Sequence, residues 1–305
     1  MSENSCRKSI ENLNLLDSFL FLAATTDPDN AKLIARVIIR RVFGWNLTDI
    51  EVGAEKQYPG VNVGQKGIRL DLEVIEKEDG KVVRIYDIEP NAYVDNTLPK
   101  RSRYYQALSD VKHLKSSTIY SVLPDYFSVW ILPYDPFGDN RMIYTAKNII
   151  VENPELEYND GVTRVFLYTD GNIGGTEEIR ALLKYFMESN DANAVDSELE
   201  AIQHVVSGIK KDREVGERYM TLDDVINYEK RDSFNEGVER GRKAGLEEGR
   251  KAGLEEGRKA GVDEGADKFI SACRKMNYSD DDIINQLIEE FSLTKKEAIA
   301  KLTNN

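Results

Sequence analysis

The pattern of hydrophobic and polar positions divides the chain into a mixed first part and a helical second part. Apolar residues at helical spacing predict helices between residues 10 and 48 and again over 98–115. From residue 177 onward the pattern stays helical, because residues 177–235 contain no proline and few glycines. Strands predicted between these segments indicate an α/β domain followed by a helical C-terminal extension.

Alternating positions predict a β-hairpin between residues 67 and 90. Residues 67–76 place apolar side chains on one face and polar side chains on the other, as in a half-buried strand. Asp79-Gly80 supplies the positive φ angles of a tight turn, and Pro90 ends the return strand because it has no N–H to donate. Apolar runs at 126–132 and 163–171 predict two further strands.

The predicted hairpin carries the candidate chemistry of the chain. Asp71 lies on the polar face of the first strand, and Asp87, Glu89 and Asn91 share a face of the second if alternation continues. Carboxylate oxygens completed by water suit Mg²⁺, which could activate water and neutralise charge on a phosphodiester. In the competing interpretation these acids form a solvated outer face, and the residue pattern alone favours that interpretation.

Net charge and composition narrow the classes of function. The 305 residues carry a formal net charge of −13, whereas proteins that bind phosphates by static charge are usually basic. Nucleic-acid binding would therefore need a local basic patch or metal ions. Only two histidines, His113 and His204, are present, which excludes His-rich zinc sites.

Cysteine usage and hydropathy indicate where the chain is expected to act. The two cysteines, Cys6 and Cys273, are far apart in sequence, and their scarcity suits the reducing cytoplasm. No apolar run approaches the roughly 20 residues that span a bilayer. We therefore expect a cytoplasmic protein without a membrane span.

Five blocks in order carry a family resemblance: GIRLDLEV, YDIEPN, LPKRSRYYQALSD, LPDYFSVWILPYDPFG and YNDGVTRVFLYTDG. They resemble the PD-(D/E)XK nuclease superfamily, and more narrowly the recombination-promoting nuclease/putative transposase family of bacteria. The resemblance implies a restriction-endonuclease-like mixed sheet flanked by helices. It also implies a hydrolase, a metal-dependent DNA endonuclease that cleaves phosphodiesters and has DNA as its partner.

The resemblance assigns three residues of the hairpin. Asp71 and Glu89 match the acidic ligands of Mg²⁺ or Mn²⁺, and Asn91 matches the catalytic lysine or glutamine position. A lysine there would orient the attacking water and stabilise charge on the phosphate. Asparagine is shorter and uncharged, so this position departs from the family pattern.

Arginines provide a second departure and the candidate DNA contacts. The helix predicted before residue 44 lacks the glutamate that many superfamily members have there. It contains instead Arg36, Arg40 and Arg41, which we expect to form a solvated helix face. After the hairpin, Arg101, Arg103 and Gln106 are candidates for DNA binding, with surface ion pairs as the equal alternative. Both departures leave open a catalytically weakened or inactive protein that binds DNA or another protein.

Residues 241–265 repeat an eight-residue unit three times, with glycine at every fourth position. Seven glycines cost about 6 kcal/mol of helix propensity relative to alanine, so a semi-helical spacer is expected. Its order could increase against a second copy, which makes a homodimer a candidate assembly. The expected domains are a nuclease-like domain (1–190), a helical extension (191–235), the Gly/Glu/Lys/Arg-rich spacer (236–267) and a small helical tail (268–305).

Overall fold

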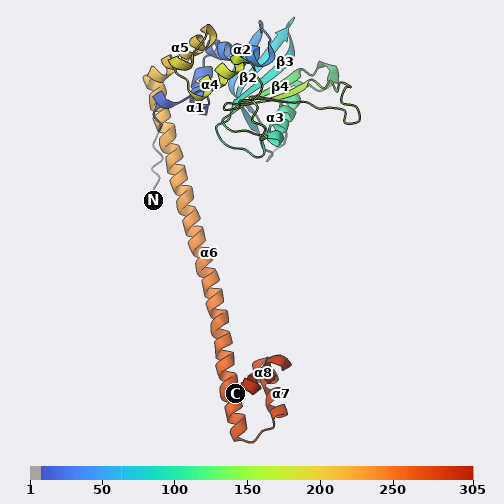
Figure 1. Cartoon of the computed structure of the whole chain (residues 1–305), viewed down its shortest axis with the longest axis vertical. Coiled ribbons are helices and arrows are strands. Elements are labelled where there is room, and N and C mark those ends of the chain that lie inside the picture. The colour runs from blue at the N-terminus through green and yellow to red at the C-terminus, as the bar shows by residue number, and fades with distance from the viewer. Residues whose placement is uncertain (1–7, 63, 305) are drawn as a thin grey trace. The chain divides into compact units, whose positions relative to one another are not determined.

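The computed structural model describes residues 8–62 and 64–304, with the backbone alone for residues 223–235 and 304. The chain forms two compact units that divide between residues 222 and 223. The first unit contains a six-stranded sheet flanked by helices, and the second is helical (Figure 1). The predicted α/β class with a helical C-terminal region is therefore confirmed.

The sheet is mixed and open. Its order is β1-β2-β3-β4-β6-β5, from strands β1 (Ile50–Tyr58), β2 (Ile68–Glu78), β3 (Lys81–Pro90), β4 (Asp125–Leu132), β5 (Ile143–Ala146) and β6 (Val162–Tyr168). Strand β3 pairs antiparallel with β2 and parallel with β4, which itself pairs parallel with β6. The edge strands β1 and β5 are antiparallel to their neighbours.

The predicted hairpin is present as β2 and β3. Asp79 and Gly80 have φ angles of 50° and 74°, which are the positive values of a tight hairpin turn. The sequence did not predict β1, because Gly53 and a series of charged residues interrupt its alternation, or β5, which has only four residues. Both are edge strands, where weak patterns are common.

Helices cover both faces of the sheet. One face packs against α1 (Ser18–Thr25), α2 (Pro28–Phe43), α4 (Glu177–Met187) and α5 (Ser197–Lys211), and the other packs against α3 (Leu98–His113). Short 3-10 segments occupy Ile10–Asn12, Tyr120–Val122 and Asp191–Asn193. Helix α2 begins where the Asp27 side chain accepts two backbone N–H groups, and it ends at Gly44 in the left-handed conformation.

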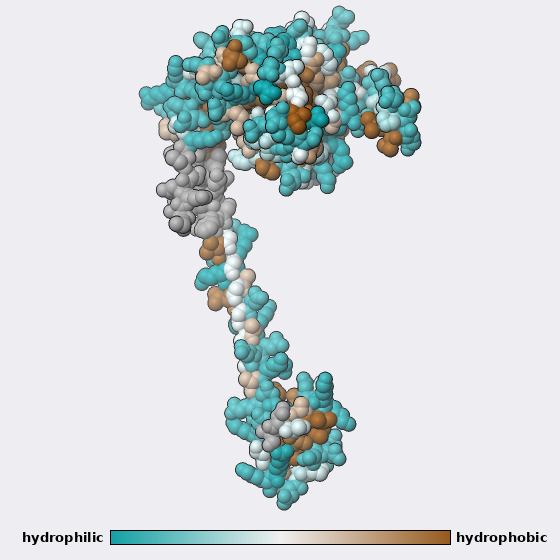
Figure 2. Space-filling view, viewed as in Figure 1, coloured by the Kyte–Doolittle hydropathy of each residue, from teal (hydrophilic) through white to brown (hydrophobic). Residues whose placement is uncertain are grey.

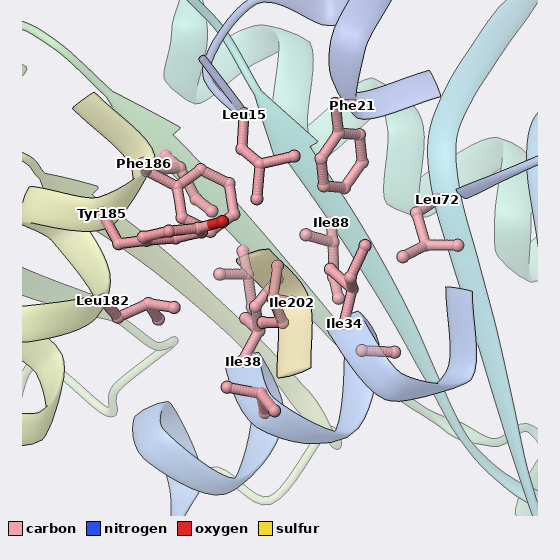
Figure 3. Close-up of a cluster of buried hydrophobic side chains, with 14 of the residues drawn as sticks. Leu15, Phe21, Ile34, Ile38, Leu72, Ile88, Leu182, Tyr185, Phe186 and Ile202 are labelled. Atoms are coloured by element: carbon pink, nitrogen blue, oxygen red, sulfur yellow. The ribbon is translucent and has the colours of Figure 1, made fainter. Parts of the chain in front are cut away.

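The main apolar core lies between the sheet and the group of four helices. Figure 3 shows side chains from α1, α2, α4, α5, β2 and β3 converging there, including Phe21, Ile38, Leu72, Ile88 and Ile202. Because Leu199, Ile202 and Val206 of α5 are fully buried in this core, the first unit continues past residue 190, where the domain boundary was expected.

The expected solvated arginine face of α2 is wrong for Arg41, which is buried, whereas Arg40 is half-buried and Arg36 is exposed as expected. Arg41 is only 5% exposed, and it donates to Asp196 at 2.7 Å and to Glu198 at 3.1 Å. Arg40 donates to both carboxylate oxygens of Glu198, and Arg36 donates to two backbone carbonyls. Arg41 is buried because α5, which begins with these acids, lies against α2.

The second unit is built from the later part of α6 (Arg213–Lys275) together with α7 (Asp280–Phe291) and α8 (Lys295–Asn304). Hydrophobic residues gather where these helices meet (Figure 2), and Ile270, Leu287 and Leu302 are buried in that cluster. The Ser279 and Thr294 side chains accept the backbone N–H groups of Asp282 and Glu297, so both helices start with a side-chain cap.

The glycine repeat lies within α6 as continuous helix, rather than as a partly helical spacer. The residues between the glycines are strong helix formers, and Glu–Lys pairs such as Glu247–Lys251, at 2.9 Å, occur in the favourable order. A Cβ atom on Gly241 or on the glycines up to Gly261 would meet no atom within 4 Å, whereas one on Gly265 would lie 3.0 Å from the Phe291 ring. Within the repeat, a side chain would therefore crowd a neighbouring helix only at Gly265.

Arg41→Ala should lower the unfolding free energy of the first unit by roughly 2–4 kcal/mol, because it removes a buried cation from two carboxylates. Urea denaturation followed by far-UV circular dichroism measures the change. Arg213→Ala is the matched control, since the Arg213 side chain is 91% exposed and its ion pair, at 2.9 Å, is with Glu217, which is also exposed. We expect about 0.5 kcal/mol or less for the control. Equal losses in the two variants would contradict a supporting role for Arg41.

Candidate functional site

The β2–β3 hairpin places four carboxylates on the face of the sheet that α3 covers. Glu73 pairs directly with Asp87 in the strand register, and the backbone N–H of Asp71 donates to Glu89 Oε1 at 2.7 Å. Glu73 and Glu89 are 2% exposed, Asp87 is fully buried and Asp71 is half-buried. The expectation of a half-buried strand with a solvated polar face is therefore wrong, because β2 and β3 are covered on both sides.

Two tyrosine hydroxyls compensate part of this buried charge. Tyr58 of β1 donates to Glu73, and Tyr126 of β4 donates to Asp87 Oδ2 at 3.0 Å. Asp87 Oδ1 has no hydrogen-bond partner within the part of the chain that the structure describes, and the same holds for two neighbouring polar atoms, Ser128 Oγ and Trp130 Nε1. Behind the carboxylates, a small group of buried polar atoms thus lacks protein partners.

Burial raises the pKa values of three of the acids, Asp71, Asp87 and Glu89. It raises the pKa of Asp71 to about 6, although Arg69 and Arg101 act in the opposite direction. Burial likewise raises the pKa of Asp87 to about 7, and it raises the pKa of Glu89 well above its ordinary value, with further increases from the charges of Asp87 and Asp71. Near neutral pH the cluster therefore holds protons that separate, solvated carboxylates would have lost.

Arg101 brings a positive charge to this cluster from α3. Its guanidinium lies 3.6 Å from Glu89 Oε2 and 3.7 Å from Asp95. The same group stacks over Trp130 at 4.9 Å and Tyr105 at 5.1 Å, and its Nε donates to the Tyr105 hydroxyl at 3.0 Å. Aromatic contacts thus hold the arginine beside the buried glutamate.

The other candidate residues from the sequence have hydrogen-bond partners other than the two acids, or are exposed. Arg103 is exposed on α3, and the Gln106 side chain donates to Asp110 at 3.2 Å while accepting from Arg164. Asn91 is 9% exposed, but its side-chain amide donates to the Tyr93 carbonyl at 3.0 Å. The structure therefore brings Asp71, Glu89 and Arg101 together and uses the amide donor of Asn91 within its own loop.

A surface cleft of about 700 Å³ opens beside Asp71. Its lining includes the basic residues Lys66, Arg69, Lys100 and Arg101, the tyrosines Tyr104 and Tyr105, and the acids Asp71 and Asp95. Lys66, Arg69 and Lys100 were not predicted as site residues. Arg69, two positions before Asp71, and Lys100, directly before Arg101, both had a sequence signal. Lys66 had none and reaches the cleft through the packing of α3, where Tyr104 donates to its carbonyl.

The donor set fits a hydrated metal ion better than an enclosed one. Among the residues that the structure describes, no group of three or more Asp, Glu, His or Cys side chains is arranged to hold a metal. Asp71 lines the open cleft, and the buried Glu89 accepts the backbone N–H of Asp71. Mg²⁺ commonly binds through one or two carboxylates with several waters retained. The pair therefore fits Mg²⁺ or Mn²⁺ on chemical grounds.

Comparisons with known proteins gave no match. No protein-family model matches the chain, and the searches of curated proteins and of solved structures also returned no match. Within the described residues, no helix has the length and apolar character needed to cross a membrane.

The raised pKa of Asp87 makes stability depend on pH. Its folded-state pKa of about 7 lies above its ordinary value of 3.8, so its contribution is fully present below about pH 4 and is lost as the pH rises to about 7. Asp87→Asn should remove this loss. At about 1.4 kcal/mol per pKa unit, the advantage of the variant should grow by roughly 2–3 kcal/mol between about pH 5 and pH 8.

Urea denaturation at the two pH values measures this difference. Asp79→Asn, in the exposed hairpin turn, is the matched control and should give the same difference from wild type at both values. An Asp87→Asn advantage that stays constant with pH would show that Asp87 is already ionised in the folded protein.

Proposed function

We propose that this chain is a metal-dependent DNA endonuclease with a PD-(D/E)XK-type fold, related to recombination-promoting nucleases and putative transposases. The observation that carries the proposal is the convergence of Asp71 and Glu89 on the central hairpin, beside a cleft lined by basic side chains. A second support is the order of the resembling sequence blocks, which fall on β2, β3, α3, β4 and β6 of one mixed sheet with its helix.

The residues of the cleft have distinct roles in this proposal. Asp71 and Glu89 would hold Mg²⁺ or Mn²⁺, which supplies charge neutralisation and an activated water when bound. Lys66, Arg69 and Lys100 line the cleft and attract the phosphate backbone of DNA, which gives this acidic protein the local basic patch that it needs. Because the two acids have raised pKa values, loading of the site releases protons and becomes easier as the pH rises.

Two observations favour a second candidate function, a nuclease-fold module that binds DNA or a protein without cleavage. Arg101 already lies beside Glu89, where a metal ion would bind. Asn91 is tied to Tyr93 and carries no charge for the phosphate. Catalysis would then be weak or absent, while the basic cleft would remain.

Supercoiled plasmid in Mg²⁺ or Mn²⁺ should be nicked or linearised by the wild-type protein. Asp71→Asn should reduce the rate on the order of 100-fold or more, because bound metal contributes several kcal/mol of charge stabilisation. Gel electrophoresis over a time course gives the rates, and Asp79→Asn is a control of equal chemistry in the hairpin turn. An intact plasmid with wild-type protein in both metals would rule out the nuclease and leave the binding module.

Asn91→Lys should raise the cleavage rate by at least about 10-fold, because a positioned cation can assist the water and the phosphate. Asn91→Gln tests the other residue type that is usual at this position, and Asn91→Ala shows what loss of the Tyr93 hydrogen bond does alone. Thermal unfolding of each variant verifies that β3 remains folded. Rates that are unchanged by Asn91→Lys in a folded protein would contradict a role for position 91 in the reaction.

A further inference from the structure

Arg101 is held in a way that points to a function beyond surface ion pairing. Its guanidinium rests on two aromatic rings, those of Trp130 and Tyr105, while its distance of 3.6 Å from Glu89 exceeds that of a well-formed charged hydrogen bond. The rings therefore fix the group more closely than the carboxylate does. A group attached in this manner can leave the glutamate without losing its main support.

In its ionised form, Glu89 requires a cation at this point of the fold. It is 2% exposed, it lies on the same strand face as Asp87, and the N–H of Asp71 occupies only one of its oxygens. A buried carboxylate without a partner is strongly destabilising. Among the described ion pairs of Glu89, the one with Arg101 supplies that charge.

We propose that Arg101 is the resident counter-ion of Glu89, that a divalent metal displaces it, and that it then binds the phosphate of DNA. This inference rests on the proposed nuclease function and adds a positioning role for a residue outside the acidic pair. Two cations cannot both approach Glu89 closely without repelling one another, so metal binding weakens the Arg101–Glu89 attraction. The guanidinium keeps its contacts with the two rings and with Asp95.

The location of the displaced group determines its ligand. The Arg101 side chain is 33% exposed, and it lines the same cleft as Arg69, Lys100 and Lys66. A planar guanidinium can bind two oxygens of one phosphate, which an ammonium group cannot match in geometry. Displacement of Arg101 thus couples metal binding at Asp71 and Glu89 to binding of the DNA phosphate backbone.

Metal affinity separates this role from simple packing. Calorimetric titration with Mn²⁺ should show affinity about 3- to 10-fold higher for Arg101→Gln than for wild type, because a competing cation has been removed. A supporting role would give lower affinity instead, since loss of the arginine would loosen the site. Arg103→Gln makes the same charge change two residues away on an exposed position of α3 and should leave the affinity at the wild-type value.

Tryptophan fluorescence follows the displacement itself. The chain has two tryptophans, so Trp45→Phe leaves Trp130, whose ring lies under the guanidinium, as the only reporter. Mn²⁺ should change Trp130 emission in this background, and the change should be smaller when Arg101→Gln is added. Arg101→Lys keeps the charge without the planar fork, so it should keep near-wild-type metal affinity but bind a short duplex in Ca²⁺ several-fold more weakly.

The outcomes distinguish the two proposals. Absence of Asp71-dependent Mn²⁺ binding in the wild-type protein would overturn both the nuclease and the displacement. Asp71-dependent binding with equal or lower affinity in Arg101→Gln would overturn the displacement alone. If Arg101→Gln does not fold, two other results can still overturn the displacement. One is a DNA affinity of Arg101→Lys equal to that of the wild type, and the other is Trp130 emission that does not respond to Mn²⁺.

Discussion

Glu73, Asp87 and Glu89 are held almost entirely out of water on adjacent strands, and a protein interior does not accept such groups without compensation. Their compensation comes from three separate parts of the fold, namely a hydroxyl from β1, a hydroxyl from β4 and a guanidinium from α3. Protons retained through raised pKa values supply the rest. The strand order and the position of α3 are therefore linked physically to the acidic cluster, since a different neighbour on either side of the hairpin would leave a carboxylate without a partner.

The two faces of the hairpin have opposite effects on the stability of the fold. Leu72 and Ile88 enter the apolar core beneath α1, α2 and α5, where burial stabilises the fold. Alternate residues on the same strands carry the acids, whose burial destabilises it. Because the strands are shared, the packed face fixes the backbone that brings Asp71 and Glu89 within 2.7 Å through the Asp71 N–H. Rigid support from one face thus permits an unfavourable arrangement of charge on the other.

Sequence reasoning predicted the hairpin and the meeting of Asp71 with Glu89, because alternation and the Asp79-Gly80 turn are local features. It did not predict the burial of Glu73 and Asp87, which depends on α3 covering the face and on Tyr58 of the neighbouring strand β1. Arg41 shows the same limit, since its burial depends on α5, more than 150 residues further along the chain. Covering elements far away in sequence decide whether a polar residue is solvated, and a single periodic segment contains no signal for them.

The residue types at positions 91 and 101 together set the positive charge beside Glu89. A lysine at position 91 would add a cation near Glu89, where Arg101 already supplies one from α3. In the metal-free protein these two cations would repel one another beside the same carboxylate. An uncharged residue at position 91, hydrogen-bonded to the Tyr93 carbonyl, avoids that repulsion. Arg101 then remains the counter-ion of Glu89. The altered position is consistent with a site whose positive charge sits on a helix instead of on the strand.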